Sequence, residues 1–162
     1  MGLHAELGKL SGGGTMRYQH IVIAVDLNGD NSKLLQKGAA LASACDAKLS
    51  LIHVEIHHAP YYASLGLQTH HYSGEVPLEV KTRKQLTDLA LRSSYPIPDV
   101  IMVSGELVPA LRKEIKAHGI DLLIFGHHHD MWSNLFSATR QAINNLDVDL
   151  LVIPLQMESE VL

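Results

Sequence analysis

Glycine, histidine and aspartate are concentrated in one short stretch of this sequence. In "LLIFGHHHDMWSNLFSATRQ" (122–141), an apolar run stops at Gly126 and is followed by three histidines, Asp130 and an amphipathic segment. Histidine and aspartate are ligands for zinc, and a glycine that leads into a helix lets a phosphate approach the backbone. The stretch therefore allows three interpretations: a metal site, a damaged phosphate loop, or a turn rich in histidine.

The metal interpretation depends on how many of these side chains can converge. Zinc needs three or four ligands at about 2.0–2.1 Å, and adjacent residues in an extended segment point to opposite sides. Of the three histidines, only His127 and His129 could share a side, with Asp130 as a third ligand. The simpler interpretation is that the histidines hydrogen-bond locally. We therefore predict no dedicated metal site, and His127 and His129 remain the two candidates for one.

Other catalytic arrangements are missing from the sequence. It contains no G-x-S-x-G elbow, no H-E-x-x-H motif and no P-loop. The single cysteine, Cys45, lies on the apolar face of a predicted helix, which is typical of an inert core residue rather than a nucleophile. We predict that the protein is not an enzyme and needs no cofactor.

Composition narrows the class of protein further. The formal net charge of −4 argues against a general nucleic-acid binder, which would need a basic face. No apolar run approaches the roughly 20 residues that span a bilayer, and the N-terminus lacks the apolar region of a signal peptide. One cysteine excludes a disulfide framework within the chain. The sequence therefore predicts a cytoplasmic protein that binds neither nucleic acid nor membrane.

Short apolar runs alternate with segments of helical period after Met16. The predicted strands cover 20–26, 48–55, 99–105, 121–126 and 148–155. The predicted helices begin at an Asn31 or Ser32 cap, at Glu75, at Glu106, and in a segment that carries Trp132 to Ile143. Strands that alternate with helices and read as continuous apolar runs indicate a parallel sheet covered on both faces. The predicted fold class is therefore α/β.

Four further expectations about this organisation follow from the sequence. In the second helix, from Glu75 to Ser94, we expect Leu78, Leu86, Leu89 and Ala90 to be buried. We expect Gly119 to end the third helix. Residues 1–15 form a flexible tail or leader, 16–156 the domain and 157–162 a C-terminal tail. Residues 56–74 form a mobile loop over the crevice near Asp26.

Two predicted strands end in polar residues that could meet. Asp26 ends the first strand, and "GHHHD" (126–130) follows the fourth. In open parallel sheets, ligands sit outside the carboxyl ends of the strands, where the strand order reverses. If the first and fourth strands are neighbours, these two ends face each other across one crevice.

The sequence resembles the universal stress protein family over about residues 16–156. The resemblance rests on "HIVIAVD", "AKLSLIHV", "DLLIFGHHHDMWSNLFSATRQAI" and "VDLLVIPL". The third stretch is the most specific, because "GHH", the aspartate, "WS" and "S-A-x-R-Q" are similar to the A-type branch of the family. The resemblance implies a flavodoxin-like, three-layer α/β fold with a five-stranded parallel sheet of order 3-2-1-4-5. It also implies a small cytoplasmic bacterial protein that rises under stress and forms a homodimer.

The nucleotide-binding branch of this family carries G-x2-G-x9-G-[S/T] after the fourth strand. Aligned on Gly126, the second glycine falls on His129, the third on Thr139 and the Ser/Thr on Arg140. A histidine at the second position occupies room that a phosphate needs, and its Cβ disfavours a left-handed backbone. The departure from the motif points away from ATP.

Part of a nucleoside pocket persists by the same resemblance. Asp26 matches an acidic residue near the ribose, Ala24 and Val54 match positions around the base, and Gly126 matches the ribose-side glycine. The alternative is that Asp26 caps a turn and that Ala24 and Val54 are plain core. An adenosine-like ligand therefore stays open.

Three functions follow as hypotheses. The first is a non-enzymatic, dimeric stress-response protein that acts through protein contacts, including paralogues or regulatory proteins. The second is a nucleotide-binding switch with an atypical pocket, and the third is a metal-dependent or metal-sensing protein. For the first, we predict a homodimer joined through Val148 to Leu155, because this apolar strand lies at an edge of the predicted sheet.

Overall fold

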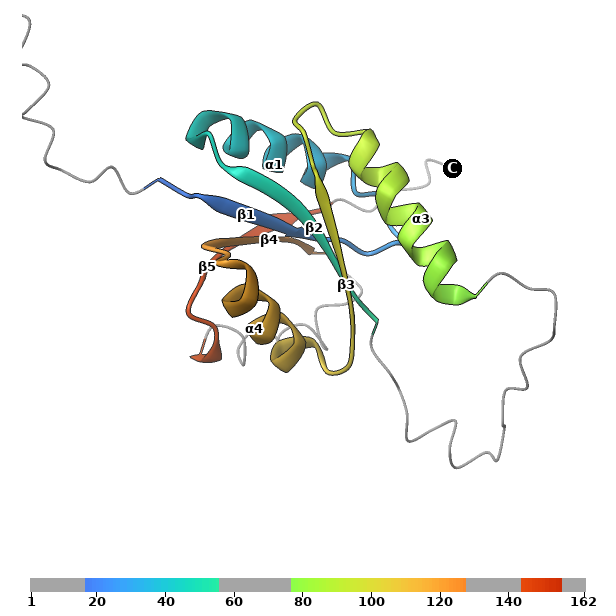
Figure 1. Cartoon of the computed structure of the whole chain (residues 1–162). Helices are drawn as coiled ribbons and strands as arrows, with labels where there is room; N and C mark the ends of the chain where they lie inside the picture. Colours follow the sequence, from blue (N-terminus) through green and yellow to red (C-terminus); the bar gives the residue numbers. More distant parts are fainter. Residues whose placement is uncertain (1–16, 56–76, 128–143, 156–162) are drawn as a thin grey trace, which may run out of the picture.

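The computed structural model describes residues 17–55, 77–127 and 144–155 (Figure 1). The strands are β1 (His20–Ala24), β2 (Lys48–Glu55), β3 (Asp99–Ser104), β4 (Leu122–His127) and β5 (Asp149–Pro154), and the helices are α1 (Ser32–Cys45), α3 (Leu78–Leu91) and α4 (Leu107–His118). These elements confirm the predicted alternation, with boundaries that shift by at most three residues. The predicted helix around Trp132, the loop 56–74 and both tails lie outside the described residues.

The five strands form one parallel sheet in the order β3-β2-β1-β4-β5, as predicted. β1 lies in the middle, where Ala24 pairs with Ile52 of β2 on one side and with Phe125 of β4 on the other. Chain connections run from β1 toward β3 and then from β4 toward β5, so the strand order reverses between β1 and β4. The first and fourth strands are therefore neighbours, and their carboxyl ends meet at one edge of the sheet.

Helices cover both faces of the sheet, as Figure 1 shows, with α1 and α3 on one face and α4 on the other. Two apolar clusters fill the two layers. Ile21, Ile23, Leu49 and Leu51 pack beneath α1, while Val22, Ile52 and Leu123 pack against α4. This alternation of faces along each strand explains why β1 and β2 read as continuous apolar runs.

The two helices on the first face are packed to different degrees. α1 lies close to β1, because a Cβ on Gly38 would stand 2.4 Å from Cδ1 of Ile23. In α3 only Thr82 and Leu86 are buried, and Leu89 and Ala90 are partly buried against the core. The expectation that Leu78 is buried is wrong, since 65% of this residue is exposed. Leu78 is the first residue of α3 and lies beyond the edge of the core.

The predicted C-terminal end of α4 is confirmed, whereas the predicted cap at the N-terminus of α1 forms no capping hydrogen bond. Gly119 ends α4 with a φ of 60°, a left-handed conformation that glycine adopts without strain. Asn31 does stand at the N-cap position of α1, but its side chain makes no capping hydrogen bond. It bonds the preceding loop instead, as described below. No helix in the described ranges is long and apolar enough to cross a membrane.

The amino ends of the strands are held together by a buried polar group. His20 is 6% exposed, and its Nδ1 lies 2.9 Å from the carbonyl oxygen of His118. Its Nε2 lies 2.8 Å from Oγ of Ser50, which is fully buried in β2. The Asp121 carboxylate accepts the backbone N–H groups of Gln19 and His20, at 2.7 and 3.0 Å. Three segments that are distant in sequence, around residues 20, 50 and 118–121, are thereby joined at one edge.

Candidate functional site

The four residues predicted to line a nucleoside-type crevice lie at the carboxyl ends of three adjacent strands. Ala24 is the last residue of β1, Val54 lies near the end of β2, and Gly126 lies near the end of β4. Asp26 follows β1 by two residues, and Val25 between them still donates its N–H to the carbonyl of Ile52, at 3.0 Å. The fold therefore brings all four to one edge, at the point where the strand order reverses.

Asp26 organises the loop that leads from β1 into α1. Its Oδ1 accepts the backbone N–H of Asn28 at 3.0 Å, and its carbonyl accepts the side-chain amide of Asn31 at 2.7 Å. The same amide donates to the carbonyl of Gly29 at 3.2 Å. Asp26 thus closes a turn, which is the structural alternative that the sequence left open. Its second carboxylate oxygen has no hydrogen bond in the described part of the chain.

The other three residues face different layers of the molecule. Ala24 and Val54 are partly buried against the apolar cluster beneath α4. Gly126 faces the opposite layer, because a Cβ there would stand 2.4 Å from Cδ1 of Leu155 and 3.2 Å from Cδ1 of Leu34. A side chain at position 126 would therefore displace a leucine. Close packing is sufficient to explain this glycine without any ligand.

The histidine cluster is described only at its beginning. His127 is the last residue of β4, next to Pro154 of β5, while His129 and Asp130 lie outside the described residues. Within the described ranges, no group of three or more histidine, cysteine, aspartate or glutamate side chains is arranged to hold a metal ion. The prediction of no dedicated metal site, with His127 and His129 as the two candidates for one, therefore stays a prediction.

A histidine–glutamate pair at the end of β2 was missed by the sequence reasoning. Nδ1 of His53 lies 3.2 Å from the carbonyl oxygen of Val25, and Nε2 lies 3.2 Å from Oε2 of Glu55. A carbonyl and an ionised carboxylate both accept hydrogen bonds, so both contacts form together only when the ring carries two protons. The pair borders a hollow of about 800 Å³ beside the start of α3. The available signal was the spacing of two residues, which places both side chains on one face of a strand.

Lys33 links the start of α1 to the end of β5 and was also missed. Its ammonium group donates to the carbonyl oxygen of Pro154 at 2.8 Å. A cation in the first turn of a helix is unfavourable to the helix dipole, so its position depends on an acceptor elsewhere. That mismatch with the usual charge pattern was the signal in the sequence. The link connects the first turn of α1 to the edge strand β5.

The edge strand β5 is buried on one side and open on the other. Ile153 is 3% exposed in the layer of α1, and Leu151 packs against the same cluster. Val152, between them, is 42% exposed. β5 pairs only with β4 among the described strands, so its outer N–H and C=O groups have no ladder partner there. An exposed valine beside an open ladder is the kind of edge that pairs with another chain.

The fold is that of an α/β protein of the flavodoxin-like class, with the strand order reversing between β1 and β4. Comparison with known proteins then places the chain more narrowly. Residues 17–154 match the model of the universal stress protein family. The chain is 43% identical over 138 residues to the universal stress protein A homolog of Haemophilus ducreyi, covering 85% of this chain and 97% of the relative. The chain belongs to the universal stress protein family.

Two further comparisons agree with this placement. Universal stress protein A of Escherichia coli is 38% identical over 145 residues, which cover 90% of this chain and 100% of the relative. Among solved structures, the universal stress protein from Archaeoglobus fulgidus in complex with dAMP has a TM-score of 0.56 at 16% identity, covering 85% of this chain and 99% of that chain. At this level of identity the structural likeness concerns the fold.

Proposed function

We propose that this protein is a cytoplasmic stress-response protein that acts as a homodimer through protein contacts, without catalysis and without an ATP phosphate loop. Its membership of the universal stress protein family, and relatives of about 40% identity that are named universal stress protein A, support the stress response. The proposed partners, besides a second copy of the chain, are paralogues of the same fold and regulatory proteins.

The observation that carries the proposal is the loss of the loop glycines. Of the three glycines in the phosphate-binding motif, only Gly126 remains, and His129 and Thr139 stand at the other two positions. A phosphate loop works because backbone N–H groups can approach the phosphate with no Cβ in the way. Gly126 itself is accounted for by its contacts with Leu155 and Leu34. The remaining match to the motif therefore does not require a nucleotide.

The homodimer is supported by the geometry of β5, which is described above. Two copies of an open edge strand related by a two-fold axis satisfy both ladders at once, and the contact is self-complementary. Val152 is the exposed apolar side chain at the middle of that strand. Pro154 supplies no N–H and stands as the last residue of β5, where pairing would end.

The proposal is tested by two measurements on the purified chain. Light scattering should give a mass of two chains, and a mass near the 17.8 kDa of one chain contradicts the homodimer. Equilibrium dialysis with labelled ATP and magnesium should show no saturable binding. One site per chain that fills at low micromolar ATP contradicts the absence of a working phosphate loop.

A second candidate function is a nucleotide-responsive switch with an atypical pocket. It is favoured by the convergence of Ala24, Asp26 and Val54 at one edge, and by the complex of the Archaeoglobus fulgidus protein with dAMP. A nucleoside that binds only the folded state raises the melting temperature by mass action. Thermal unfolding with adenosine or dAMP distinguishes the two functions. An increase that Asp26→Asn abolishes supports the switch, and an unchanged melting temperature supports the first proposal.

A further inference from the structure

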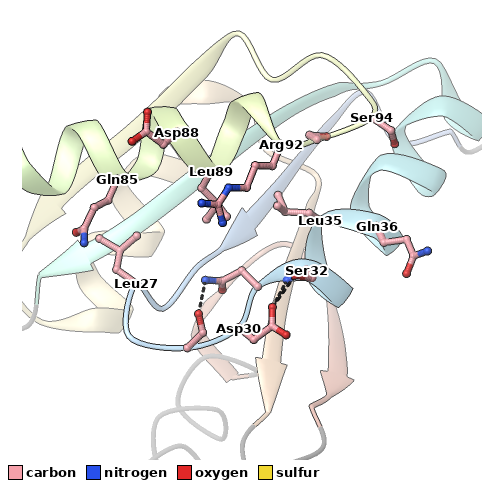
Figure 2. A pocket seen from close by; sticks show the side chains of 13 residues that line it. Leu27, Asp30, Ser32, Leu35, Gln36, Gln85, Asp88, Leu89, Arg92 and Ser94 are labelled. Atoms are coloured by element: carbon pink, nitrogen blue, oxygen red, sulfur yellow. Dashed lines mark hydrogen bonds between the residues drawn. The ribbon is translucent and has the colours of Figure 1, made fainter.

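A second hollow lies on the face of the sheet that α1 and α3 cover, between α3 and the loop that leads into α1 (Figure 2). Its volume is about 770 Å³, within the range of about 300–1,000 Å³ that is usual for small-molecule sites. Leu27 of the loop, Leu35 of α1 and Leu89 of α3 supply its apolar surface. The residues Ala24, Val54 and Gly126 do not line it. This α1–α3 cleft is therefore separate from the nucleoside-type crevice.

Arg92 supplies the positive charge of the α1–α3 cleft. It stands at the C-cap of α3, where its backbone N–H donates to the carbonyl of Leu89 at 3.1 Å. Figure 2 shows the side chain extending from the end of α3 beside Leu89, and the carboxylate of Asp88, which also lines the cleft, points away from Leu27 and Leu35. No hydrogen bond or ion pair ties the guanidinium to another described residue. A guanidinium with free donors matches the two oxygens of a carboxylate or phosphate group.

On the opposite wall of the cleft, the polar side chains of Asp30 and Asn31 form hydrogen bonds within the protein. Oδ1 of Asp30 accepts both the N–H and the O–H of Ser32, at 2.9 and 2.6 Å. These bonds, the side-chain bond first, hold the pKa of Asp30 below its ordinary value. The side-chain amide of Asn31 is used by the carbonyls of Asp26 and Gly29. This wall is therefore formed before any ligand arrives, which lowers the cost of ordering on binding.

We propose that the α1–α3 cleft is a binding site for a small organic anion. Arg92 binds the carboxylate or phosphate group of the ligand, and the three leucines receive its apolar body. Gln85, on the same side of α3 as Leu89 and Arg92, offers an amide that can donate or accept at the polar end. The hydrogen bond from Asn31 to the carbonyl of Asp26 joins the wall of this site to the loop between β1 and α1.

The experiment follows NMR shifts of the full chain during titration with two probes, phenylacetate and phenyl phosphate, and with neutral 2-phenylethanol. A fragment of about ten heavy atoms is expected to bind with a Kd on the order of 1 mM. The expected result is saturable binding of at least one anionic probe, with shifts at Gln85 and Leu27, and at least about tenfold weaker binding of the alcohol, which corresponds to about 1.4 kcal/mol. The stronger probe tells whether the ligand is a carboxylate or a phosphate.

Two variants of α3 make the test specific. Arg92→Met keeps the length of the side chain and removes the charge, so the anionic probe should bind about tenfold more weakly. Arg83→Met is the matched control, because Arg83 lies on the same helix but lines the hollow beside β2 and β3. Arg92→Lys keeps the charge but lacks the planar pair of guanidinium donors, so it should bind the anionic probe with an intermediate Kd. Binding by this variant also shows that substitution at position 92 leaves the fold intact. Equal binding by all the variants, or no saturable binding of either anion to the wild type, overturns the proposal.

Discussion

At the amino ends of the strands, buried polar side chains form hydrogen bonds inside the molecule. At the carboxyl ends, several polar side chains instead lie beside hollows or contact the edge strand. His20 uses both ring nitrogens inside the molecule, one of them on the fully buried Ser50. At the other end, His53 bonds a glutamate that borders a hollow, and Lys33 holds the last carbonyl of the edge strand. The same five strands therefore have buried, internally bonded polar groups at one end and accessible polar groups at the other.

This difference follows from the topology. All five strands run in one direction, so every loop that follows a strand emerges at the carboxyl edge and can be varied without changing the sheet. The amino edge receives the helix ends, and its buried groups must be satisfied to avoid a desolvation penalty. We infer that breaking the buried hydrogen bonds of the amino edge has the largest effect on stability, while the exposed side chains of the carboxyl edge are the ones available for association or binding.

The largest stability effect is expected at Ser50. Replacing it with alanine leaves Nε2 of His20 without its partner in a buried position, at a cost of about 1–3 kcal/mol in the free energy of unfolding. Ser104→Ala is the matched control, because Ser104 ends β3 at the carboxyl edge and is exposed. Urea unfolding of both variants measures the difference. If Ser50→Ala costs no more than Ser104→Ala, the contrast between the two edges is wrong.

A smaller effect is expected at Gly126, on the carboxyl edge. The new Cβ of Gly126→Ala meets Leu155 and Leu34, and the resulting overpacking should cost about 1 kcal/mol, at the low end for buried sites because a leucine side chain can move. Adding Leu155→Ala should relieve part of that cost. Thermal unfolding of the two single variants and the double variant gives the coupling. Strictly additive losses would show that packing against Leu155 is not the reason for this glycine.

The smallest effect is expected at the exposed ion pair between Lys48 and Asp99 on the amino edge. The hydrogen bond from Lys48, and then its charge, lower the pKa of Asp99. A lowered pKa adds stability above the unfolded value of about 3.9, and that stability is lost as the pH falls through the folded pKa. Asp99→Asn should therefore lower the melting temperature slightly at neutral pH. The difference from the wild type should vanish at acidic pH, and a difference that grows there contradicts the assignment.

Much of the fold follows from the sequence because its signals are local and repeated. "HIVIAVD" and "KLSLIHVE" are apolar on both faces, which is the pattern of central strands, and Gly119 marks the end of a helix. The order of the strands came from the resemblance to a family rather than from periodicity. Leu78 was misjudged because helical spacing continues past the point where the core ends.

The candidate site was predictable only in part. Asp26, Ala24, Val54 and Gly126 could be placed at one edge, since each follows or ends an apolar run. The bond from Lys33 to Pro154 spans 121 residues, so the local charge pattern marks Lys33 as unusual but does not indicate its acceptor. The α1–α3 cleft likewise depends on how far α3 stands from α1, which tertiary packing decides. Spacing predicts which residues share a face, but not which of them a distant element leaves uncovered.

Sedimentation velocity over a series of concentrations tests the central proposal, a homodimer through β5, most directly. The wild type should sediment as twice the 17.8 kDa chain, and Val152→Lys should raise the dimer dissociation constant at least about tenfold, or about 1.4 kcal/mol. Val80→Lys, at an exposed valine of α3, is the matched control and should leave it unchanged. A monomeric wild type contradicts the dimer, and a Val152→Lys protein that dimerises like the Val80→Lys protein contradicts its placement on β5.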